Sequence, residues 1–387
     1  MKVRKSHILT ATKGDDRPSN VLFFDTETSQ TPGKKNTKIH QLKLGVAIHT
    51  RTSRGDRLKT QSELIFFRKS EFWAYAQEKA RPKCPLYLVA HNLIFDLVVV
   101  DAFMCLQSAG WDLESFYTKG MVSIFRWTLG DRTILGVDNS NLFSGTLASW
   151  GTIAGVPKMS VDFDTVSDAD LIPYCHRDVE IMVALWRMWL GFLDTHKCGT
   201  FKPTVGSTAF NTWRHRFMSA RVHIHNHPLG LQLERESYRG GRVEALYKGS
   251  LTQGPYYYLD VNSMYAHMLR RYSYPAGIYS AKETDSLSMM LRKLEKHAVI
   301  ARVVIETPEP WFPVIRDGFT CYPVGRFQTT LTTPELIMSS KEVGCGASVP
   351  SPGTGRGGCL ASTSITFTVS AASIRMPVIS DTPGFAS

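Results

Sequence analysis

The sequence predicts an α/β fold over roughly residues 20–200, because apolar strands alternate there with segments of helical periodicity. Residues 21–24 form an apolar run between polar turn formers, which is typical of a buried strand. The run LYLVA at 86–90 predicts another buried strand, and the apolar residues behind it continue with helical length as far as Gly110. From Asp168, apolar residues recur every three or four positions, which predicts a long helix.

Local chemistry predicts the remaining elements. A polar loop separates the first strand from a second one, LKLGVAI at 42–48. Pro173 is expected in the first turn of the long helix or before it, because it has no backbone N–H to donate. After a basic connector, a second unit opens with PYYYLDVNSMYAHML and continues through several short strands to about residue 343. Residues 344–387 are rich in Ser, Thr, Gly and Pro, and no periodic pattern there predicts a packed element.

The composition indicates a soluble, basic protein. A net charge of +11 and a pI near 9.3 favour a polyanionic partner, most simply nucleic acid, over a merely basic surface. No apolar run is long enough for a membrane span, and no apolar core follows a basic start as in a secretory signal. The seven cysteines are scattered without a CxxC pair, which suits a reducing intracellular compartment and argues against a disulfide framework or a cysteine zinc site.

Acidic residues directly follow the first strand. Asp25 and Glu27 are two positions apart, so on a strand their side chains share a face, and two like charges held that close are costly unless a cation lies between them. The alternative is a strand end with two solvated acids. Downstream, AHNLIFDL places Asn92, Phe95 and Asp96 on one face of a helix.

A third element carries Tyr174 and Asp178 one helical turn apart, again on one face. If the three elements meet, four carboxylates converge, which is unstable without metal and well suited to two divalent ions. Carboxylate oxygens favour Mg²⁺ or Mn²⁺. Two such ions can activate a water and stabilise the leaving oxygen of a phosphodiester, and the hydroxyl of Tyr174 could orient that water.

The strings FDTET, HNLIFD and YCHRD resemble the three exonuclease motifs, DxE, Nx₂(F/Y)D and Yx₃D, of the proofreading domain in family B DNA polymerases. They are most similar to the protein-primed branch, found in certain bacteriophages, adenoviruses and linear organellar plasmids. The resemblance implies a ribonuclease-H-like domain that removes nucleotides from a 3′ end, with Tyr174 positioning the nucleophile. The metal ligands that it implies are Asp25, Glu27, Asp96 and Asp178.

Accessory positions also match the family. Lys158, in PKMSV, resembles a lysine that would stabilise charge developing on a phosphate. The string TLASW resembles an element that contacts single-stranded DNA, which implies this role for Thr146 and Leu147. Aromatic rings stack on unpaired bases, and small polar side chains hold phosphates. The residues that match those holding the frayed 3′ strand are Thr28, His91, Asn92 and Phe95.

The connector contains YRGG, which resembles the YxGG motif that joins exonuclease and polymerase domains in this family. Paired glycines let a backbone approach a phosphate closely, and the flanking arginines supply charge. A simple Gly-Gly turn is the alternative. The DNA-binding residues that the resemblance implies here are Tyr238, Arg239, Gly240 and Gly241.

The second unit contains DVNSMYAHM, which resembles polymerase motif A. The resemblance implies that Asp260 binds metal and nucleotide and that Tyr265 forms the floor of the sugar pocket. Met264 and Ala266 replace the usual Leu and Pro. A fingers motif (Kx₃NSxYG) and a second palm motif (YxDTDS) are absent from the sequence, and ETDSLS at 283–288 is interpreted as a coincidental likeness. Polymerisation by this chain is therefore doubtful.

These resemblances divide the chain into four predicted segments. Residues 1–205 are expected to form the ribonuclease-H-like 3′–5′ exonuclease domain, residues 206–254 a basic linker with the YRGG motif, and residues 255–343 a partial α+β polymerase palm. Residues 344–387 are expected to be a low-complexity tail, disordered or frame-shifted.

A rival site lies in the connector. HIHNH at 223–227 places three histidines at alternate positions, which on a strand would share a face and could bind zinc. Because the connector is basic, solvated or phosphate-contacting histidines are the favoured interpretation.

The leading hypothesis is a family B DNA polymerase for DNA replication, present as its proofreading exonuclease and the start of its palm. The implied partners are single-stranded and primer-template DNA, a dNTP in the intact polymerase, and a terminal protein primer; no membrane is expected. The implied location is a virus-infected host cell or an organelle that carries a plasmid, such as a mitochondrion. The alternative is a non-enzymatic remnant that binds single-stranded DNA. A dedicated nuclease of the same fold is disfavoured, because it has no use for the YRGG and DVNSMY motifs.

Overall fold

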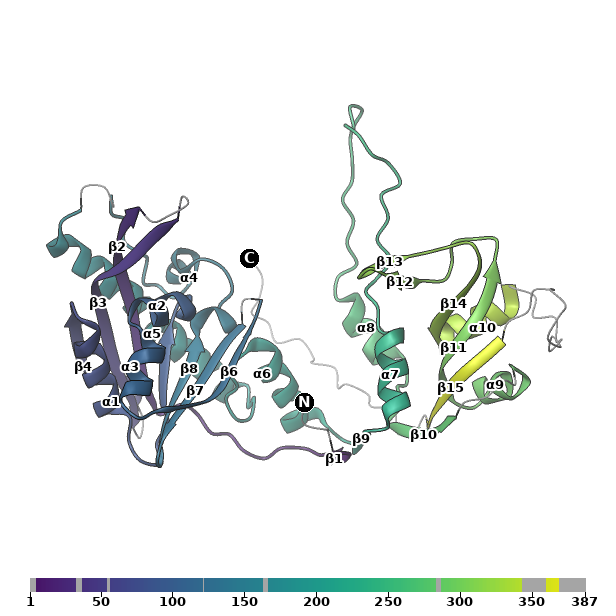
Figure 1. Ribbon diagram of the computed structural model, residues 1–387, viewed down its shortest axis with the longest axis horizontal. Coiled ribbons are helices and arrows are strands. Elements are labelled where there is room, and N and C mark those ends of the chain that lie inside the picture. Colours follow the sequence, from purple (N-terminus) through teal and green to yellow (C-terminus); the bar gives the residue numbers. More distant parts are fainter. Residues whose placement is uncertain are drawn as a thin grey trace. The chain divides into compact units, whose positions relative to one another are not determined.

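The computed structural model describes residues 5–32, 37–53, 56–120, 122–162, 166–282, 287–342 and 360–368 (Figure 1). The chain divides into two compact units. The N-terminal unit is Thr12–Arg216, and the C-terminal unit combines Met1–Ala11 with Phe217–Ser387. Among the described residues, no helix is both long and apolar enough to cross a membrane.

The N-terminal unit is built on a seven-stranded mixed sheet of order β4-β3-β2-β5-β8-β7-β6. Strand β2 is parallel to β5, and β5 to β8, whereas the strands on either side of these three pair antiparallel. The strands are β2 (Asn20–Pro32), β3 (Lys38–Ser53), β4 (Asp56–Phe66), β5 (Leu86–Ala90), β6 (Asp112–Lys119), β7 (Val122–Leu129) and β8 (Arg132–Asp138).

Helices cover both faces of this sheet (Figure 1). One face packs against α4 (Leu147–Ile153) and α5 (Asp168–Thr195), and the other against α1 (Lys69–Lys79), α2 (Leu93–Val99) and α3 (Ala102–Ser108). The further helical segments are α6 (Val205–Thr212) and the short turns η2 (Asn139–Asn141) and η3 (Trp213–Phe217). The predicted α/β class is therefore confirmed, and 42–48 and 86–90 lie in strands as predicted.

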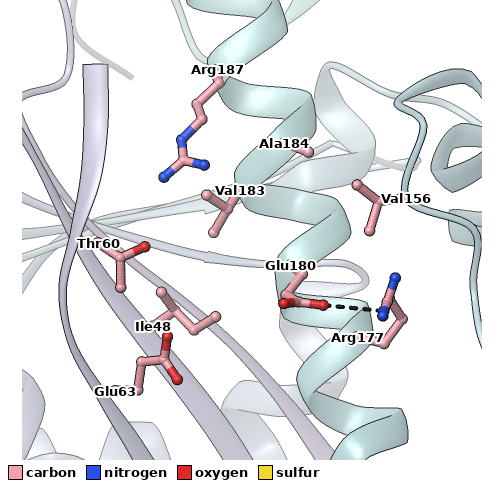
Figure 2. Close-up of a pocket in the computed structure, with 9 residues that line it drawn as sticks. All are labelled: Ile48, Thr60, Glu63, Val156, Arg177, Glu180, Val183, Ala184 and Arg187. Atoms are coloured by element: carbon pink, nitrogen blue, oxygen red, sulfur yellow. Dashed lines mark ion pairs between the residues drawn. The ribbon is translucent and has the colours of Figure 1, made fainter. Parts of the chain in front are cut away.

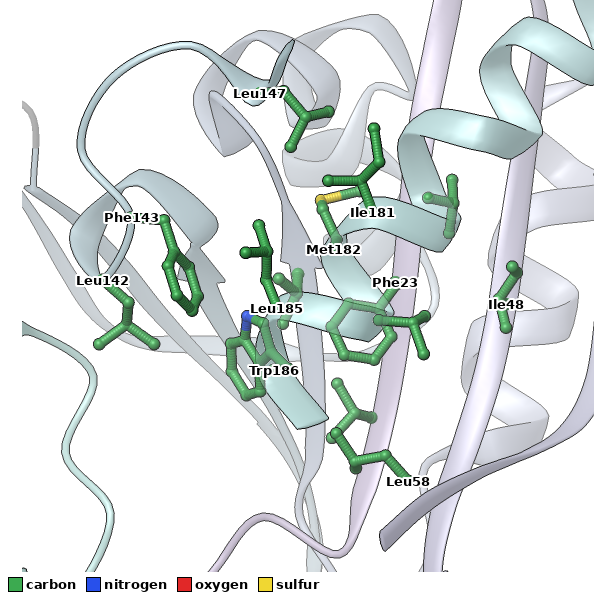
Figure 3. Close-up of a cluster of buried hydrophobic side chains, with 14 of the residues drawn as sticks. Phe23, Ile48, Leu58, Leu142, Phe143, Leu147, Ile181, Met182, Leu185 and Trp186 are labelled. Atoms are coloured by element: carbon green, nitrogen blue, oxygen red, sulfur yellow. The ribbon is translucent and has the colours of Figure 1, made fainter. Parts of the chain in front are cut away.

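The first predicted strand, within β2, is buried on both faces. Val21 and Phe23 pack in one core with α5, and the ring of Phe23 meets that of Trp186 edge-on, with centroids 5.5 Å apart (Figure 3). Leu22 and Phe24 point to the other face, into a second core with α1, α2 and α3. A strand covered on both sides reads as a continuous apolar run rather than an alternating one, which is why this segment was recognisable in the sequence.

Two details of the helices differ from the predictions. Pro173 lies inside α5, beyond its first turn, so the expectation that it lies in the first turn or before it is wrong. The cost is limited because a proline there removes one hydrogen bond, whereas the following turns bury a long apolar stripe. The apolar stretch after β5 forms two helices instead of one, because Asp101 adopts a left-handed conformation (φ 54°) between α2 and α3.

The C-terminal unit contains a four-stranded antiparallel sheet of order β10-β15-β11-β14. Its core is formed mainly by alternate residues of β11, such as Val299, Val303 and Ile305, which pack against α9 and α10. The strands are β1 (His7–Leu9), β9 (Val222–Ile224), β10 (Gly277–Lys282), β11 (Ala298–Thr307), β12 (Val314–Arg316), β13 (Phe319–Cys321), β14 (Gly325–Thr332) and β15 (Leu360–Thr368). The helices are α7 (Pro228–Ser237), α8 (Met264–Arg271), α9 (Leu287–Leu294) and α10 (Thr333–Glu342).

The tail holds a regular element that the sequence analysis did not expect. Strand β15, Leu360–Thr368, pairs antiparallel with both β10 and β11, so the expectation of no packed element in 344–387 is wrong there. Its Ser/Thr-rich composition hid it, although Thr is β-branched and favours strands. The rest of the predicted tail, 344–359 and 369–387, lies outside the described residues, as do positions 283–286 of the ETDSLS string.

Candidate functional site

Strand β2 carries the first two predicted acids, Asp25 and Glu27, just beyond the residues that pair with β5. A β-bulge between Glu27 and Thr28 interrupts the pairing with β3 directly after Asp25 and Glu27. Bulges re-aim side chains and are frequent beside active sites. Ligand atoms of Asp25, Glu27 and Cys175 of α5 lie within 4.8 Å of one another. We call Asp25, Glu27, Asp96 and Asp178, together with Cys175, the carboxylate site.

Asp96 joins the site from α2. It is 2% exposed, and its Oδ1 accepts a hydrogen bond of 2.6 Å from Thr26 Oγ1, so the residue between the two strand acids anchors the third. The start of α2 is itself held by Asp138, whose carboxylate accepts bonds from the backbone N–H groups of Asn92 (3.2 Å) and Leu93 (2.9 Å). The sequence analysis missed Asp138; the signal was an Asp at the end of a strand, followed by Asn-Ser, which is a turn former.

Asp178 and Tyr174 enter from α5, as their spacing predicted. Asp178 is 4% exposed, and Lys158 donates a hydrogen bond to its Oδ2. The ammonium of Lys158 also lies over the ring of Tyr174, 4.5 Å from the centroid. Lys158 thus links these two residues, although it comes from a loop. The other carboxylate oxygen, Asp178 Oδ1, is buried and has no hydrogen-bond partner among the described residues.

Burial and mutual repulsion shift the acids of the site toward their neutral forms. Burial first, and then the charges of Asp96 and Asp178, holds the pKa of Asp25 well above its usual range. Burial and the charge of Asp178 raise the pKa of Glu27 to about 7, and burial raises the pKa of Asp96 to about 8. Burial also raises the pKa of Asp178, against the hydrogen bond from Lys158. Such shifts mark a site whose charges lack compensation, which divalent cations would supply.

The residues present therefore fit one or two divalent ions. The donor set consists mainly of carboxylate oxygens, the ligands that Mg²⁺ and Mn²⁺ prefer. The partnerless Asp178 Oδ1 is a buried lone-pair donor of the kind that an ion would satisfy.

Residues predicted to hold a DNA strand surround the carboxylate site. Thr28 Oγ1 lies 3.0 Å from Nδ1 of His40, whose ring meets that of Phe95 edge-on at 5.3 Å between centroids. His40 was missed by the sequence analysis, because it is separated from α2 by more than fifty residues and only the β2–β3 pairing brings it there.

His91 has both ring nitrogens engaged. Its Nδ1 accepts from the side-chain amide of Asn139 (3.1 Å), so Nε2 carries the proton and donates to the carbonyl of Gly145 (3.2 Å). Burial lowers the pKa of His91, which keeps the ring neutral. His91 thus ties β5 to the segment that precedes α4. At α4, Thr146 caps the helix by accepting from Ser149 N (3.3 Å), and Leu147 is buried in the core.

In the C-terminal unit, the residues of the YRGG motif differ from one another in exposure. Tyr238 is 83% exposed, but the guanidinium of Arg239 is buried, donates to Thr329 Oγ1 (3.2 Å) and Thr330 O, and pairs with Glu335 (3.6 Å). The charge of Arg239 is thus paired within the C-terminal unit, and its contact with DNA stays a prediction. A Cβ added at Gly240 or Gly241 meets no atom within 4 Å.

Motif A lies in an exposed stretch. No strand is described between β9 and β10, Asp260 is exposed, and Tyr265 at the start of α8 is 74% exposed. The structure therefore does not bring these two residues into a site within the described part of the chain.

The histidines of HIHNH do not form a zinc site. Strand β9 ends at Ile224, and His225 Nε2 pairs with Glu234 Oε1 at 3.0 Å. His227 caps α7 by accepting from Gly230 N through its Nδ1. Within the described residues, the one group of three clustered potential ligands is that of Asp25, Glu27 and Cys175.

A pocket of about 330 Å³ lies along α5 but shares no residue with the carboxylate site (Figure 2). Its helical wall contains Arg177, which pairs with Glu180 at 3.1 Å, and Arg187, which donates to the carbonyl of Leu58. The charged groups there are already paired, so we place the chemistry at the carboxylate site. The lining residues are Ile48, Thr60, Glu63, Val156, Arg177, Glu180, Val183, Ala184 and Arg187.

Comparison with known proteins supports the motif resemblance. Residues 164–343 match the family model "DNA polymerase type B, organellar and viral". No curated protein matches the chain. The match includes the positions of Tyr174, Asp178 and Asp260, whereas those of Asp25 and Asp96 lie before it.

Solved structures match over more of the chain. Phi29 DNA polymerase complexed with primer-template DNA and incoming nucleotides matches with a TM-score of 0.56 and 13% identity, over 91% of this chain and 62% of the polymerase. The same polymerase complexed with single-stranded DNA gives 0.53 and 13%, over 91% and 61%. The chain thus spans about three fifths of the phi29 polymerase, with which it shares a mixed α/β fold. Residues 164–343 thus match the organellar and viral family of type B DNA polymerases, the family that the motifs predicted.

Proposed function

We propose that the N-terminal unit is a 3′–5′ exonuclease of ribonuclease-H-like type, which hydrolyses the terminal phosphodiester of single-stranded DNA with two divalent ions. The observation that carries the proposal is the convergence of four acids from β2, α2 and α5, with raised pKa values and a partnerless oxygen at Asp178. The likeness to a type B polymerase supports the substrate class.

The residues of the carboxylate site and Tyr174 would have different roles in this reaction. Asp25, Glu27, Asp96 and Asp178 would hold the ions. Bound divalent ions supply Lewis-acid stabilisation of charge on phosphate oxygens. Tyr174 would orient the attacking water through its hydroxyl.

Lys158 has a second role in this scheme. Burial opposes its charge, but hydrogen bonds with Asp178 and Tyr174 raise the pKa of the Lys158 ammonium, so it stays cationic. A fixed cation beside the reacting phosphate stabilises the charge that develops in the transition state.

The predicted strand-holding residues complete the proposal. Phe95 and His40 form an aromatic pair on the side of Thr28, and an aromatic ring there could stack on an unpaired base of any sequence. Stacking on an unpaired base would favour single-stranded substrates. We therefore expect faster cleavage of frayed than of paired 3′ ends.

The test is degradation of a 5′-labelled single-stranded oligonucleotide with Mg²⁺ or Mn²⁺. The intact chain should shorten it from the 3′ end, and Asp25→Ala/Glu27→Ala should not. Glu180→Gln is the matched control, because it removes another acid from α5 in the pocket that shares no residue with the site. Undiminished cleavage in excess chelator would sink the two-ion proposal.

We further propose that this chain does not polymerise DNA. Asp260 is exposed and lies outside any strand, and the fingers motif and second palm motif are missing from the sequence. Primer extension with dNTPs by purified protein should give no product above background. Templated incorporation would show that the proposal is wrong.

A second candidate function is DNA binding without cleavage. It is favoured by the net charge of +11. It is also favoured by Tyr257 and Tyr258, which follow the YRGG segment in the sequence, are 83% and 96% exposed, and offer surfaces on which bases could stack. Salt-sensitive binding of an oligonucleotide that remains intact with Mg²⁺ would support this function over the first.

A further inference from the structure

We propose that Cys175 is a metal ligand of the carboxylate site and makes it a binding site for thiophilic ions such as Cd²⁺ and Zn²⁺. The inference rests on the proposed function for the location of the site but adds a property to it. An ion held by sulfur and carboxylates would occupy the place of Mg²⁺ and inhibit the nuclease.

The geometry matches direct coordination of one ion by sulfur and carboxylate oxygen. Sγ of Cys175 lies 3.5 Å from Oδ2 of Asp25, and the ligand atoms of Asp25, Glu27 and Cys175 are all within 4.8 Å of one another. Zn–S and Zn–O bonds of about 2.3 and 2.1 Å at a tetrahedral angle place the two ligand atoms about 3.6 Å apart. The observed separation therefore leaves room for an ion between sulfur and oxygen with little rearrangement.

The surroundings point to an ion and not to a simple core cysteine. Asp178, three residues further along α5, is 4% exposed and has a buried Oδ1 without a hydrogen-bond partner among the described residues. Cys175 itself is buried, but Asp25 and Glu27 are partly exposed, so an ion can enter from the carboxylate side.

Binding exchanges a proton for the ion. The single hydrogen of the thiol is now shared between two acceptors of Asp25, its backbone oxygen and Oδ2, each 3.5 Å from Sγ. When the ion binds, the S–H bond breaks, the proton leaves to solvent and a sulfur–metal bond forms. No oxidant or reductant is required.

The inference makes the site selective between ion classes. Mg²⁺ takes oxygen ligands and would leave the sulfur protonated, whereas soft ions gain a thiolate bond at the same place. Thiophilic ions should therefore displace Mg²⁺ at concentrations far below that of the Mg²⁺ itself.

The experiment is a Cd²⁺ titration of the full chain without DNA, followed by the ultraviolet sulfur-to-cadmium charge-transfer band. The intact chain and Cys198→Ser should both show the band, and Cys175→Ser should lose one equivalent of it. Cys198 is the matched control, because it is also buried, at 5% exposure, and follows α5 directly. Full amplitude in Cys175→Ser would overturn the inference.

A second variant separates a joint site from a lone thiol. Asp25→Asn/Glu27→Gln keeps the sulfur but removes the carboxylates, so its Cd²⁺ affinity should fall at least about tenfold, as expected when ligands or their supports are lost. Unchanged affinity would mean that Cys175 binds alone and would also overturn the inference. Far-ultraviolet circular dichroism of each variant without metal excludes misfolding as the cause.

The two proposals fail separately. A band that depends on Cys175, in a chain that does not cleave DNA with Mg²⁺, would leave the metal site standing and remove the nuclease. Cleavage with Mg²⁺ but no band that depends on Cys175 would do the reverse. In a chain that has both, the Cd²⁺ concentration that halves each variant's own rate should rise at least about tenfold in Cys175→Ser.

Discussion

The acidic residues of the two units stand in opposite surroundings. In the N-terminal unit, Asp96 and Asp178 are 2% and 4% exposed, and the carboxylates raise one another's pKa values. In the C-terminal unit, Asp260 of motif A is exposed and lies outside any strand. Both sets were found by motif resemblance with the same ease. The difference teaches that a motif becomes a site only where the surrounding fold removes its charges from water and holds them together.

The arginine of YRGG illustrates a second difference between sequence pattern and surroundings. Its residue type predicted a phosphate contact, yet Arg239 is buried and Arg242, three residues later, is the more exposed of the two. Charge in a sequence indicates a partner of opposite charge, but that partner can be inside the chain. Here the partners of the Arg239 guanidinium are Glu335 and the carbonyl of Thr330.

The largest expected effect separates function from stability in the N-terminal unit. Asp25→Asn should lower the cleavage rate by more than about a hundredfold, because it removes a proposed ligand of the ions. The same change should raise the melting temperature of the metal-free chain at pH 8, because it removes one of several buried, mutually repelling acids. Cleavage assays and thermal melts in chelator measure the two effects. A variant that still cleaves, or that melts earlier, would contradict the proposed electrostatics.

In the C-terminal unit, Arg239→Ala should destabilise by about 3 kcal/mol, because it leaves buried acceptors and Glu335 without their partner. The matched Arg242→Ala should destabilise the unit far less, because its pair with Glu244 is exposed. Hydrogen exchange of β14 amides reports on this unit directly. Equal protection in both variants would show that Arg239 does not hold the connector to the sheet.

The stability of the metal-free N-terminal unit should depend on pH through its buried acids. The folded pKa values of Glu27 and Asp96, about 7 and about 8, lie above the usual 4.5 and 3.8, so the folded state binds protons more tightly than the unfolded state. These groups contribute stability at acid pH that is lost as the pH rises through about 8. Metal-free melts should therefore fall between pH 5.5 and 8.5, and Mg²⁺ should reduce the fall. A fall of equal size with and without Mg²⁺ would argue against an ion at these acids.

The smallest effect concerns the paired glycines. Gly240→Ala and Gly241→Ala should change the stability by less than about 0.5 kcal/mol, because a Cβ there meets no atom within 4 Å. If the backbone contacts a phosphate, each should still weaken binding of single-stranded DNA, as measured by fluorescence anisotropy at several salt concentrations. Unchanged binding would favour the simple Gly-Gly turn.

Much of the N-terminal fold was predictable because its signals are local. The buried run 21–24, the strand 86–90 and the helix from Asp168 are each recognisable from the apolar pattern, and all three are present. Strand β15 was not predicted, because its Ser/Thr-rich sequence shows no strong apolar pattern and its partners β10 and β11 lie far away in the chain.

For the candidate site, the sequence by itself determined the residue types and their spacing along each element: Asp25 with Glu27, Asp96, and Tyr174 one turn before Asp178. Strand and helix periods are properties of the local backbone, so spacing suffices to place side chains on a common face. Only the tertiary structure decided that Cys175 joins them, that Lys158 donates to Asp178, that Asp138 anchors α2, and that Arg239 points inward. Those outcomes depend on burial and on contacts between segments far apart in the chain, which no local pattern encodes.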